Sequence, residues 1–297
     1  KMNWRRLAVE YGVPSDMATA LADLLMKYSK SMQINLRIQG EKLQERVVFV
    51  GYGGMSRVLA GALVKAGHSV VITGRNLDAA MKLARDLGCS CMDIVSALEF
   101  GEYVVLALPP EAFRSGYVDE IARYFRDRIV MDILSSKSWI FNHIENKSLS
   151  NNFMYVSTHP LFGPLTTPIG EKIAVIPSRT GGAVLQRVVN LWYSAGLEPI
   201  ILSLEEHEKA MAIVQVLTHL YLLALSRASE KLSKELGINA DRLSTPTYRE
   251  VRAVLEKLKY MEGVVFEIQK TNPFSALVRE RALEALKDVI EYLGRES

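Results

Sequence analysis

The sequence of 297 residues contains very little cysteine. Its two thiols, Cys89 and Cys91, are separated by a single serine. That spacing is too tight for an ordinary disulfide, and two cysteines are too few for a structural zinc site. We therefore expect no disulfide framework and a reducing, cytoplasmic setting.

The chain also lacks an excess of charge of either sign. Lys and Arg number 36 and Asp and Glu number 33, which leaves a formal net charge of +3. The basic residues are scattered along the sequence, whereas a protein that binds a phosphate backbone needs a basic patch or stripe. We expect no nucleic-acid partner, and the charge is compatible with an anionic small molecule as ligand.

Long apolar runs are missing as well. The longest, residues 213–225, is interrupted by Gln215, Thr218 and His219. It is shorter than the roughly 18 apolar residues that a membrane span needs. The amino terminus has neither the apolar core nor the small-residue cleavage site of a signal peptide. We therefore expect no membrane partner and no secretion signal.

What is present indicates a globular protein of about two domains, since 49% of residues are hydrophobic and 23% are charged. Residues 1–40 carry apolar side chains at helical spacing, and Gly40 is expected to end that helix. Residues 46–202 alternate short β-rich runs with helical stretches, which predicts an α/β, Rossmann-like dinucleotide-binding domain with a parallel sheet. Residues 203–297 show helical patterns only, and we expect an all-helical dimerisation and substrate domain there.

The first long helix of that last domain, residues 205–236, is apolar on nearly all sides in its middle. A helix of this kind is usually buried, often against a second subunit. We therefore expect a homodimer formed through the helical domain.

A glycine-rich loop follows the first predicted strand and opens a helix. Glycines at this place let the backbone turn tightly and approach a pyrophosphate, which the helix N-terminus attracts. Ser56 replaces the third glycine of the usual fingerprint. We expect the cofactor-binding loop to comprise Gly51, Tyr52, Gly53, Gly54, Met55, Ser56 and Arg57.

The end of the second strand bears on the choice of cofactor. An NAD enzyme usually carries Asp or Glu there, whereas this chain has Arg75 followed by Asn76. An arginine can pair with a 2′-phosphate, so NADP is the expected cofactor and NAD the second choice. Alternatively, Arg75 stacks on the adenine or points to solvent. Arg57 is expected to add a second cation.

Two further motifs lie near the expected nicotinamide. Leu108 ends the predicted strand over residues 103–108 and Pro109 follows it, at the edge where the nicotinamide half is expected. Backbone packing alone equally explains the proline. His159 follows the apolar run 154–157 and begins the string His-Pro-Leu-Phe-Gly-Pro. A histidine at the carboxyl end of a sheet suits proton transfer near neutral pH. His219, within an apolar helix, indicates a core histidine on composition alone.

Taken together, these motifs resemble prephenate dehydrogenase of tyrosine biosynthesis. The resemblance covers about residues 46–297 and rests on the glycine loop, the string from His159, the segment from Val214 to His219, and Pro-Thr-Tyr-Arg ending at Arg249. It implies an enzyme that oxidises and decarboxylates prephenate to 4-hydroxyphenylpyruvate with a nicotinamide cofactor. It also implies a Rossmann domain followed by a helical dimerisation domain.

The resemblance assigns roles to individual residues. His159 corresponds to the general base that bonds the ring hydroxyl of the substrate, and Ser135 to a serine that orients the histidine and the substrate. His219 corresponds to a second active-site histidine, which replaces its interpretation as a core residue. Lys257 stands where the family commonly carries an arginine for a substrate carboxylate. Lysine lacks the planar fork of arginine, so Arg249, or else Arg252 or Arg279, is the alternative ligand.

The amino-terminal segment resembles the last helix of the all-helical chorismate mutase. The match covers about 35 residues, including Ser29 and Gln33 on one face, and an amphipathic helix with a polar seam explains it equally well. The cationic first helix of that family is absent, so we expect no mutase activity of this sequence. The resemblance implies the remainder of a mutase fused to a dehydrogenase.

Two other functions fit the same residues. An arogenate dehydrogenase uses the same fold and histidine, and a side-by-side assay of the two substrates distinguishes it. A non-catalytic, dimeric regulator that binds NADP would bind the dinucleotide without turnover.

Overall fold

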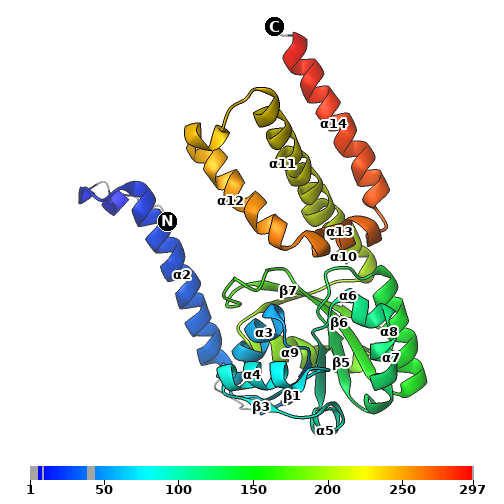
Figure 1. The fold of residues 1–297 in the computed structure, drawn as a ribbon. Helices are drawn as coiled ribbons and strands as arrows, with labels where there is room; N and C mark the ends of the chain where they lie inside the picture. Colours follow the sequence, from blue (N-terminus) through cyan, green and yellow to red (C-terminus); the bar gives the residue numbers. More distant parts are fainter. Residues whose placement is uncertain (1–5, 9, 39–43, 296–297) are drawn as a thin grey trace. The chain divides into compact units, whose positions relative to one another are not determined.

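The computed structural model describes residues 6–8, 10–38 and 44–295 of the chain (Figure 1). The chain divides into two compact units. Unit 1 comprises residues 1–134 and 141–202, and unit 2 comprises residues 135–140 and 203–297. The short segment 135–140, which the sequence analysis assigned to the dinucleotide-binding domain, thus groups with the helical unit.

Unit 1 is built on one eight-stranded sheet with the strand order β3-β2-β1-β4-β5-β6-β7-β8. All neighbouring strands pair in parallel except β6 and β7, which are antiparallel. This arrangement, with helices beside the sheet and a helical second unit, confirms the predicted fold class. The strands are β1 (Arg46–Val50), β2 (Ser69–Thr73), β3 (Ser90–Cys91), β4 (Tyr103–Leu106), β5 (Ile129–Asp132), β6 (Met154–Pro160), β7 (Lys172–Pro177) and β8 (Glu198–Ile201).

The helices of unit 1 begin and end where local chemistry favours it. Asn76 caps α4 by accepting from the Ala79 N–H, and Gly88 ends it in the left-handed conformation. Asp93 caps α5 in the same way. The helices are α2 (Ser15–Ile38), α3 (Gly54–Lys65), α4 (Leu77–Leu87), α5 (Ile94–Phe100), α6 (Pro110–Arg114), α7 (Tyr117–Ile121), η1 (Ala122–Tyr124), α8 (Ser138–Asn151), η2 (Gly182–Val184) and α9 (Leu185–Ser194).

The core of unit 1 lies on both faces of the sheet. Strand β4 is buried at every position and β1 at every position after Arg46, which is typical of parallel strands covered by helices on both sides. Helix α2 occupies Ser15–Ile38, so most of the described residues before residue 39 are helical. The expected stop at Gly40 and the side chain of Gln33 lie outside what the structure describes.

Strand β6 is longer than the sequence pattern predicts, since it continues through Pro160. The cause is non-local, because residues 156–160 pair with β7 and His159 stands opposite Ala174. His159 therefore lies inside a strand, whereas the sequence analysis placed it just after one. Strand β8 was missed altogether, since it is a short edge strand with two exposed isoleucines.

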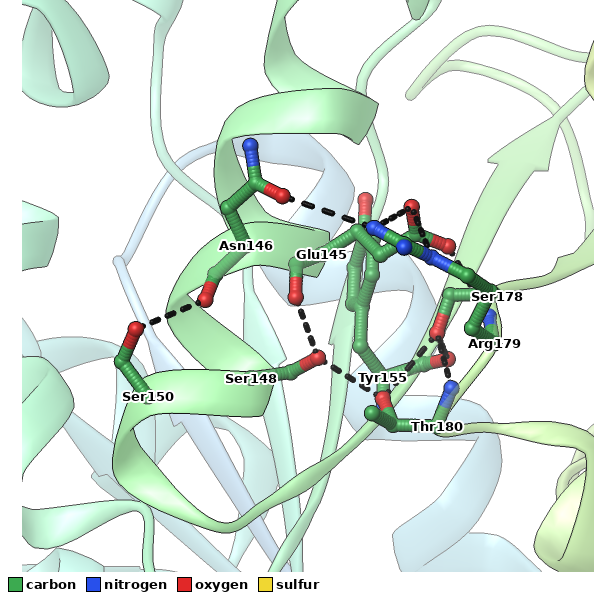
Figure 2. Close-up of polar contacts among 8 residues, drawn as sticks. All are labelled: Glu145, Asn146, Ser148, Ser150, Tyr155, Ser178, Arg179 and Thr180. Carbon is green, nitrogen blue, oxygen red and sulfur yellow. Dashed lines mark hydrogen bonds and ion pairs between the residues drawn. The ribbon is translucent and has the colours of Figure 1, made fainter.

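A polar cluster holds the beginning of β6 between α8 and the residues after β7 (Figure 2). The Ser178 hydroxyl donates to the Tyr155 carbonyl at 2.6 Å, and the Tyr155 N–H donates to the Thr180 hydroxyl at 3.2 Å. Ser148 of α8 bonds Thr180 at 2.7 Å, and Arg179 pairs with the buried carboxylate of Glu145. The amino-terminal half of β6 is thereby fixed to its surroundings.

Unit 2 is helical, with α10 (Leu204–Met211), the π-helix η3 (Ala212–Leu217), α11 (Thr218–Glu235), η4 (Ala240–Leu243), α12 (Pro246–Tyr260), α13 (Glu262–Thr271) and α14 (Ser275–Arg295). A capping box between Ser203 and Glu206 starts α10. The π-turn disturbs the regular hydrogen-bond ladder, and the Gln269 amide donates to the Val216 carbonyl there at 2.6 Å.

A buried carboxylate holds the segment 135–140 in unit 2. Glu208 of α10 accepts from the Lys137 backbone N–H at 3.1 Å, and the Asn272 amide donates to its Oε2 at 2.9 Å. Both Glu208 and Asn272 are buried, as is the side chain of Lys137. These bonds explain why this short segment belongs with the helices.

Helices α10, η3 and α11 form one continuous helical run, Leu204–Glu235. In the described part of the chain it is the one helix that could cross a membrane by length and composition, and 17% of its most apolar window is buried. The sequence analysis counted 13 residues and expected no such segment. Ile213 and Val214 in its middle are 66% and 61% exposed in the single chain.

Candidate functional site

The predicted cofactor loop lies at the carboxyl edge of the sheet, where a parallel α/β sheet binds ligands. Gly51 directly follows β1 and has a φ of +124°, which L-residues rarely adopt. A Cβ atom there would collide with the carbonyl oxygen of Ala107, which follows the neighbouring strand β4. Only glycine lets the chain turn here, because two strand ends approach so closely.

Gly53 leaves room for a dinucleotide, whereas a Cβ atom at Gly54 would come within 2.8 Å of Pro164. Gly53 is the N-cap of α3, and a Cβ atom at this position would meet nothing within 4 Å. The α3 N-terminus has no side-chain cap, so its first N–H groups are available to an anion. Ser56 is buried, and its hydroxyl has no hydrogen-bond partner among the residues that the structure describes. An open N-terminus beside this hydroxyl fits a pyrophosphate.

The two arginines predicted to bind cofactor phosphates, Arg57 and Arg75, contact different kinds of side chain. Arg57 donates to the Asp86 carboxylate on α4 at 2.8 Å, and both side chains are about half exposed. The Arg75 guanidinium lies 5.2 Å from the centre of the Tyr117 ring on α7. Arg75 therefore has an aromatic rather than an acidic neighbour, while Arg57 is already paired with a carboxylate.

Three predicted residues of the cofactor edge have mainly local roles in the structure. Tyr52 lies against Gly74, where a Cβ atom would come within 2.8 Å of its ring. The Asn76 side chain caps α4, and Pro109 occupies the N-cap position of α6 without a side-chain hydrogen bond. Leu108 and Pro109 follow β4, at the same edge of the sheet as the glycine loop.

His159 is 4% exposed and lies in the carboxyl-terminal half of β6, at that edge. Around the same place is a polar network that the sequence analysis did not identify. Its centre is Asp132, the last residue of β5 and fully buried. The Tyr155 and Ser157 hydroxyls donate to its Oδ2 at 2.7 and 2.5 Å. Burial and the nearby Asp132 carboxylate raise the pKa of Tyr155 well above its ordinary value.

Unit 2 carries the remaining predicted residues. Ser135 is half-buried in the segment that joins unit 2 after β5. His219 is in the first turn of α11, directly after the π-helix, and its buried Nδ1 has no hydrogen-bond partner. Burial lowers the pKa of His219, so its imidazole is neutral at neutral pH. π-turns of this kind are frequent at functional sites.

The candidate carboxylate ligands on α12 and α14 can be separated by their contacts. Arg252 pairs with Asp241 and Glu256, and the Arg279 guanidinium donates to the Gln269 carbonyl. Lys257 and Arg249 are exposed, and among the described residues neither forms an ion pair. Among the described residues, Arg252 is therefore the member of this set whose charge is paired with carboxylates, whereas Arg249 and Arg279 each donate to a backbone carbonyl.

Asp132 and Tyr117 are the residues of the site that sequence reasoning missed. The sequence does contain a signal for Asp132, because this acidic residue follows an apolar run and stands three residues before Ser135. Tyr117 had none, since it lies far from Arg75 in sequence and in a short helix. Within the described residues, no group of three or more His, Cys, Asp or Glu side chains could hold a metal ion.

Comparisons with known proteins agree with this geometry. Residues 46–136 match the family model described as NADP oxidoreductase, coenzyme F420-dependent. The segment is thus an oxidoreductase-type dinucleotide-binding domain. A curated relative, the "Probable arogenate/prephenate dehydrogenase" of Methanocaldococcus jannaschii, is 24% identical over 247 residues, which are 81% of this chain. The chain spans 55% of that relative's length.

Two solved structures show the same fold. A Corynebacterium glutamicum protein assigned as a prephenate dehydrogenase superposes with a TM-score of 0.73 at 21% identity, over 85% of this chain and 83% of that one. The prephenate dehydrogenase of Aquifex aeolicus, bound to hydroxyphenyl propionate and NAD⁺, gives 0.63 at 21% identity, over 86% and 94%. These matches are to dehydrogenases, so the resemblance of residues 1–40 to a chorismate mutase stays a prediction.

The two glycines of the loop provide a matched pair of variants. Gly53→Ala should leave the free energy of unfolding within about 1 kcal/mol of wild type, because its backbone conformation suits any residue. The added methyl group fills the space expected for the pyrophosphate, so dinucleotide affinity should fall about tenfold or more. Fluorescence titration and thermal unfolding measure the two effects.

Gly51→Ala is the contrasting variant. Its strained φ and the collision with Ala107 should destabilise unit 1 by more than about 2 kcal/mol. Wild-type dinucleotide affinity in the Gly53→Ala protein would rule out pyrophosphate binding at this loop.

Proposed function

We propose that this chain is a nicotinamide-dependent dehydrogenase that oxidises and decarboxylates prephenate to 4-hydroxyphenylpyruvate in tyrosine biosynthesis. The observation that carries the proposal is the position of His159, buried in β6 at the carboxyl edge that also holds the open glycine loop. The name of the Methanocaldococcus jannaschii relative supports the substrate class. The two free cysteines accord with a cytoplasmic setting.

The chain's own residues can meet each requirement of this reaction. A ring alcohol is oxidised more readily as its hydroxyl loses a proton, and His159 is the base that would accept that proton. The bound nicotinamide supplies the hydride acceptor. The resemblance to prephenate dehydrogenase assigns to Ser135 the orientation of the histidine and the substrate, and to His219 a hydrogen bond that its neutral imidazole can offer without adding charge. Lys257 or Arg249 would pair with a substrate carboxylate.

Arogenate is the alternative substrate, because the relative's printed name includes both compounds. Arogenate carries an amino group where prephenate has a keto group, and the ring chemistry at His159 is the same for both. Initial rates with the two compounds, measured side by side, decide between them. A regulator without turnover is disfavoured, since the relatives are dehydrogenases.

Replacement of His159 tests the proposed base. His159→Asn should lower kcat by about 10²- to 10⁴-fold, the usual contribution of general acid–base help. Dinucleotide affinity should change little, because the glycine loop is untouched. His143→Asn is a suitable control, since His143 bonds Asp119 on α7 and has no role in the proposed reaction. A near-normal kcat in the His159→Asn protein would show that the base is another residue.

We also propose that NADP is preferred over NAD. Arg75 has no acidic neighbour among its described contacts and lies over an aromatic ring, so its charge is available to a 2′-phosphate. A charge-assisted hydrogen bond contributes roughly 1.5 to 3 kcal/mol, or about tenfold to a hundredfold in affinity.

Arg75→Ala should therefore weaken NADP about tenfold to a hundredfold and leave NAD nearly unchanged. Arg57→Ala is the matched control, and its effect should be smaller because Arg57 already pairs with Asp86. Isothermal titration with each dinucleotide gives the four comparisons. Equal or tighter binding of NAD by the wild type would remove the basis for this preference.

A homodimer through unit 2 is the third part of the proposal. Ile213 and Val214 are exposed in unit 2. Helix α14 in addition exposes a row of large apolar side chains, namely Leu283, Leu286, Val289, Ile290 and Leu293. Surfaces of this kind usually mark an interface. Light scattering at micromolar concentration should give the mass of two chains, near twice 33.2 kDa. A monomer mass there would contradict the dimer.

A further inference from the structure

The buried carboxylate of Asp132 is not explained by the fold alone. An uncompensated charge in a protein interior is costly, so a buried aspartate is retained only where donors converge on it. Here Oδ2 accepts from Tyr155 and Ser157, and Oδ1 accepts from the Leu134 N–H at 3.0 Å. All three donors lie within unit 1.

These bonds fix the backbone just before His159. The pairing of Val130 with Tyr155 sets β5 beside β6 in parallel. Successive side chains of a strand alternate between faces, so Tyr155, Ser157 and His159 share one face. Asp132 binds the first two of this row, and its own carbonyl oxygen accepts from the Thr158 hydroxyl at 2.6 Å. The two residues that precede His159 are thereby tied to a single residue of β5.

The third donor, the Leu134 N–H, bonds the other oxygen of the same carboxylate, Oδ1. Leu134 is the last residue of unit 1 before the chain enters unit 2 at Ser135. Its bond to Oδ1 closes a tight turn directly before that point. One buried side chain thus constrains the backbone next to both residues to which catalytic roles are assigned.

We propose that Asp132 is a positioning residue that acts through His159, by holding the carboxyl-terminal half of β6. Of the two measurements below, only that of kcat rests on the function proposed above, because the NMR measurement needs no turnover. The opposite end of β6 is held separately by Ser178 and Thr180 (Figure 2). Loss of the Asp132 contacts should therefore disturb His159 while the start of the strand stays in place.

Two substitutions of Asp132 separate its contacts from its charge. Asp132→Ala removes all three side-chain acceptor bonds. Asp132→Asn can keep them, since its amide oxygen accepts from Leu134 and its N–H groups donate to the two hydroxyls, which then act as acceptors. Ser148→Ala is the control, because it removes two hydrogen bonds from the cluster at the other end of β6.

The first readout is the ring signal of His159 in NMR spectra of histidine-labelled protein, assigned with His159→Asn. Asp132→Ala should shift or broaden this signal, whereas Asp132→Asn and Ser148→Ala should leave it close to wild type. Should Asp132→Ala fail to fold, Ser157→Ala removes one donor and should move the same signal. An unchanged His159 signal in a folded Asp132→Ala or Ser157→Ala protein would overturn the proposal.

The second readout is a double-mutant cycle on kcat. Asp132→Ala should lower kcat about tenfold to a hundredfold, the scale of a displacement near 1 Å of a catalytic group. In the His159→Asn background the same change should cost less than about twofold, because residues that act as a unit are not additive. Effects that multiply would show that Asp132 does not act through His159. If the wild type turns over neither prephenate nor arogenate, the proposed function fails, while the NMR result still decides the role of Asp132.

Discussion

A carboxylate without access to water needs donors around it, and the arrangement of unit 1 at its functional edge follows from this requirement at Asp132. Strand β6 must lie beside β5 so that Tyr155 and Ser157 reach Oδ2. The chain must also turn at once after β5 so that the Leu134 N–H reaches Oδ1. Any slip of β6 by one residue would turn both hydroxyls to the other face and leave the charge unpaired.

The pattern of the sequence predicted β1, β2, β4 and β5, because each is a short and mostly buried apolar run between helices. The two-residue strand β3 is neither apolar throughout nor buried, and it was not predicted. Gly51 and Gly53 were predicted as part of the dinucleotide loop because a glycine motif between a strand and a helix is a local signal in the sequence. The extension of β6 through Pro160 was not predictable in this way. It depends on pairing with β7, and the sequence gap between them contains no regular element.

Side-chain contacts between residues far apart in the sequence were the least predictable part of the candidate site. The pairing of Arg57 with Asp86 joins two helices, and the contact of Arg75 with Tyr117 joins residues more than forty positions apart. The positive charge of Arg57 or of Arg75 does not by itself indicate which side chain the arginine contacts. The ring of His68 likewise accepts from the Glu45 N–H and bonds the Ser194 hydroxyl, two partners far from it in the sequence. Such contacts are fixed by tertiary packing, which local patterns do not encode.

The exposed apolar side chains of α11 and α14 have a consequence for the thermodynamics of unit 2. None of the residues of α11 is buried in the single chain, and α14 buries only Ser275 and Ala282. Helices with so little burial gain little stability on their own, because packing of an apolar face provides most of a helix's stability in water. Association that covers these faces links folding to mass action. With the proposed homodimer, the thermal midpoint of unit 2 would rise with protein concentration, while that of the well-packed unit 1 would not.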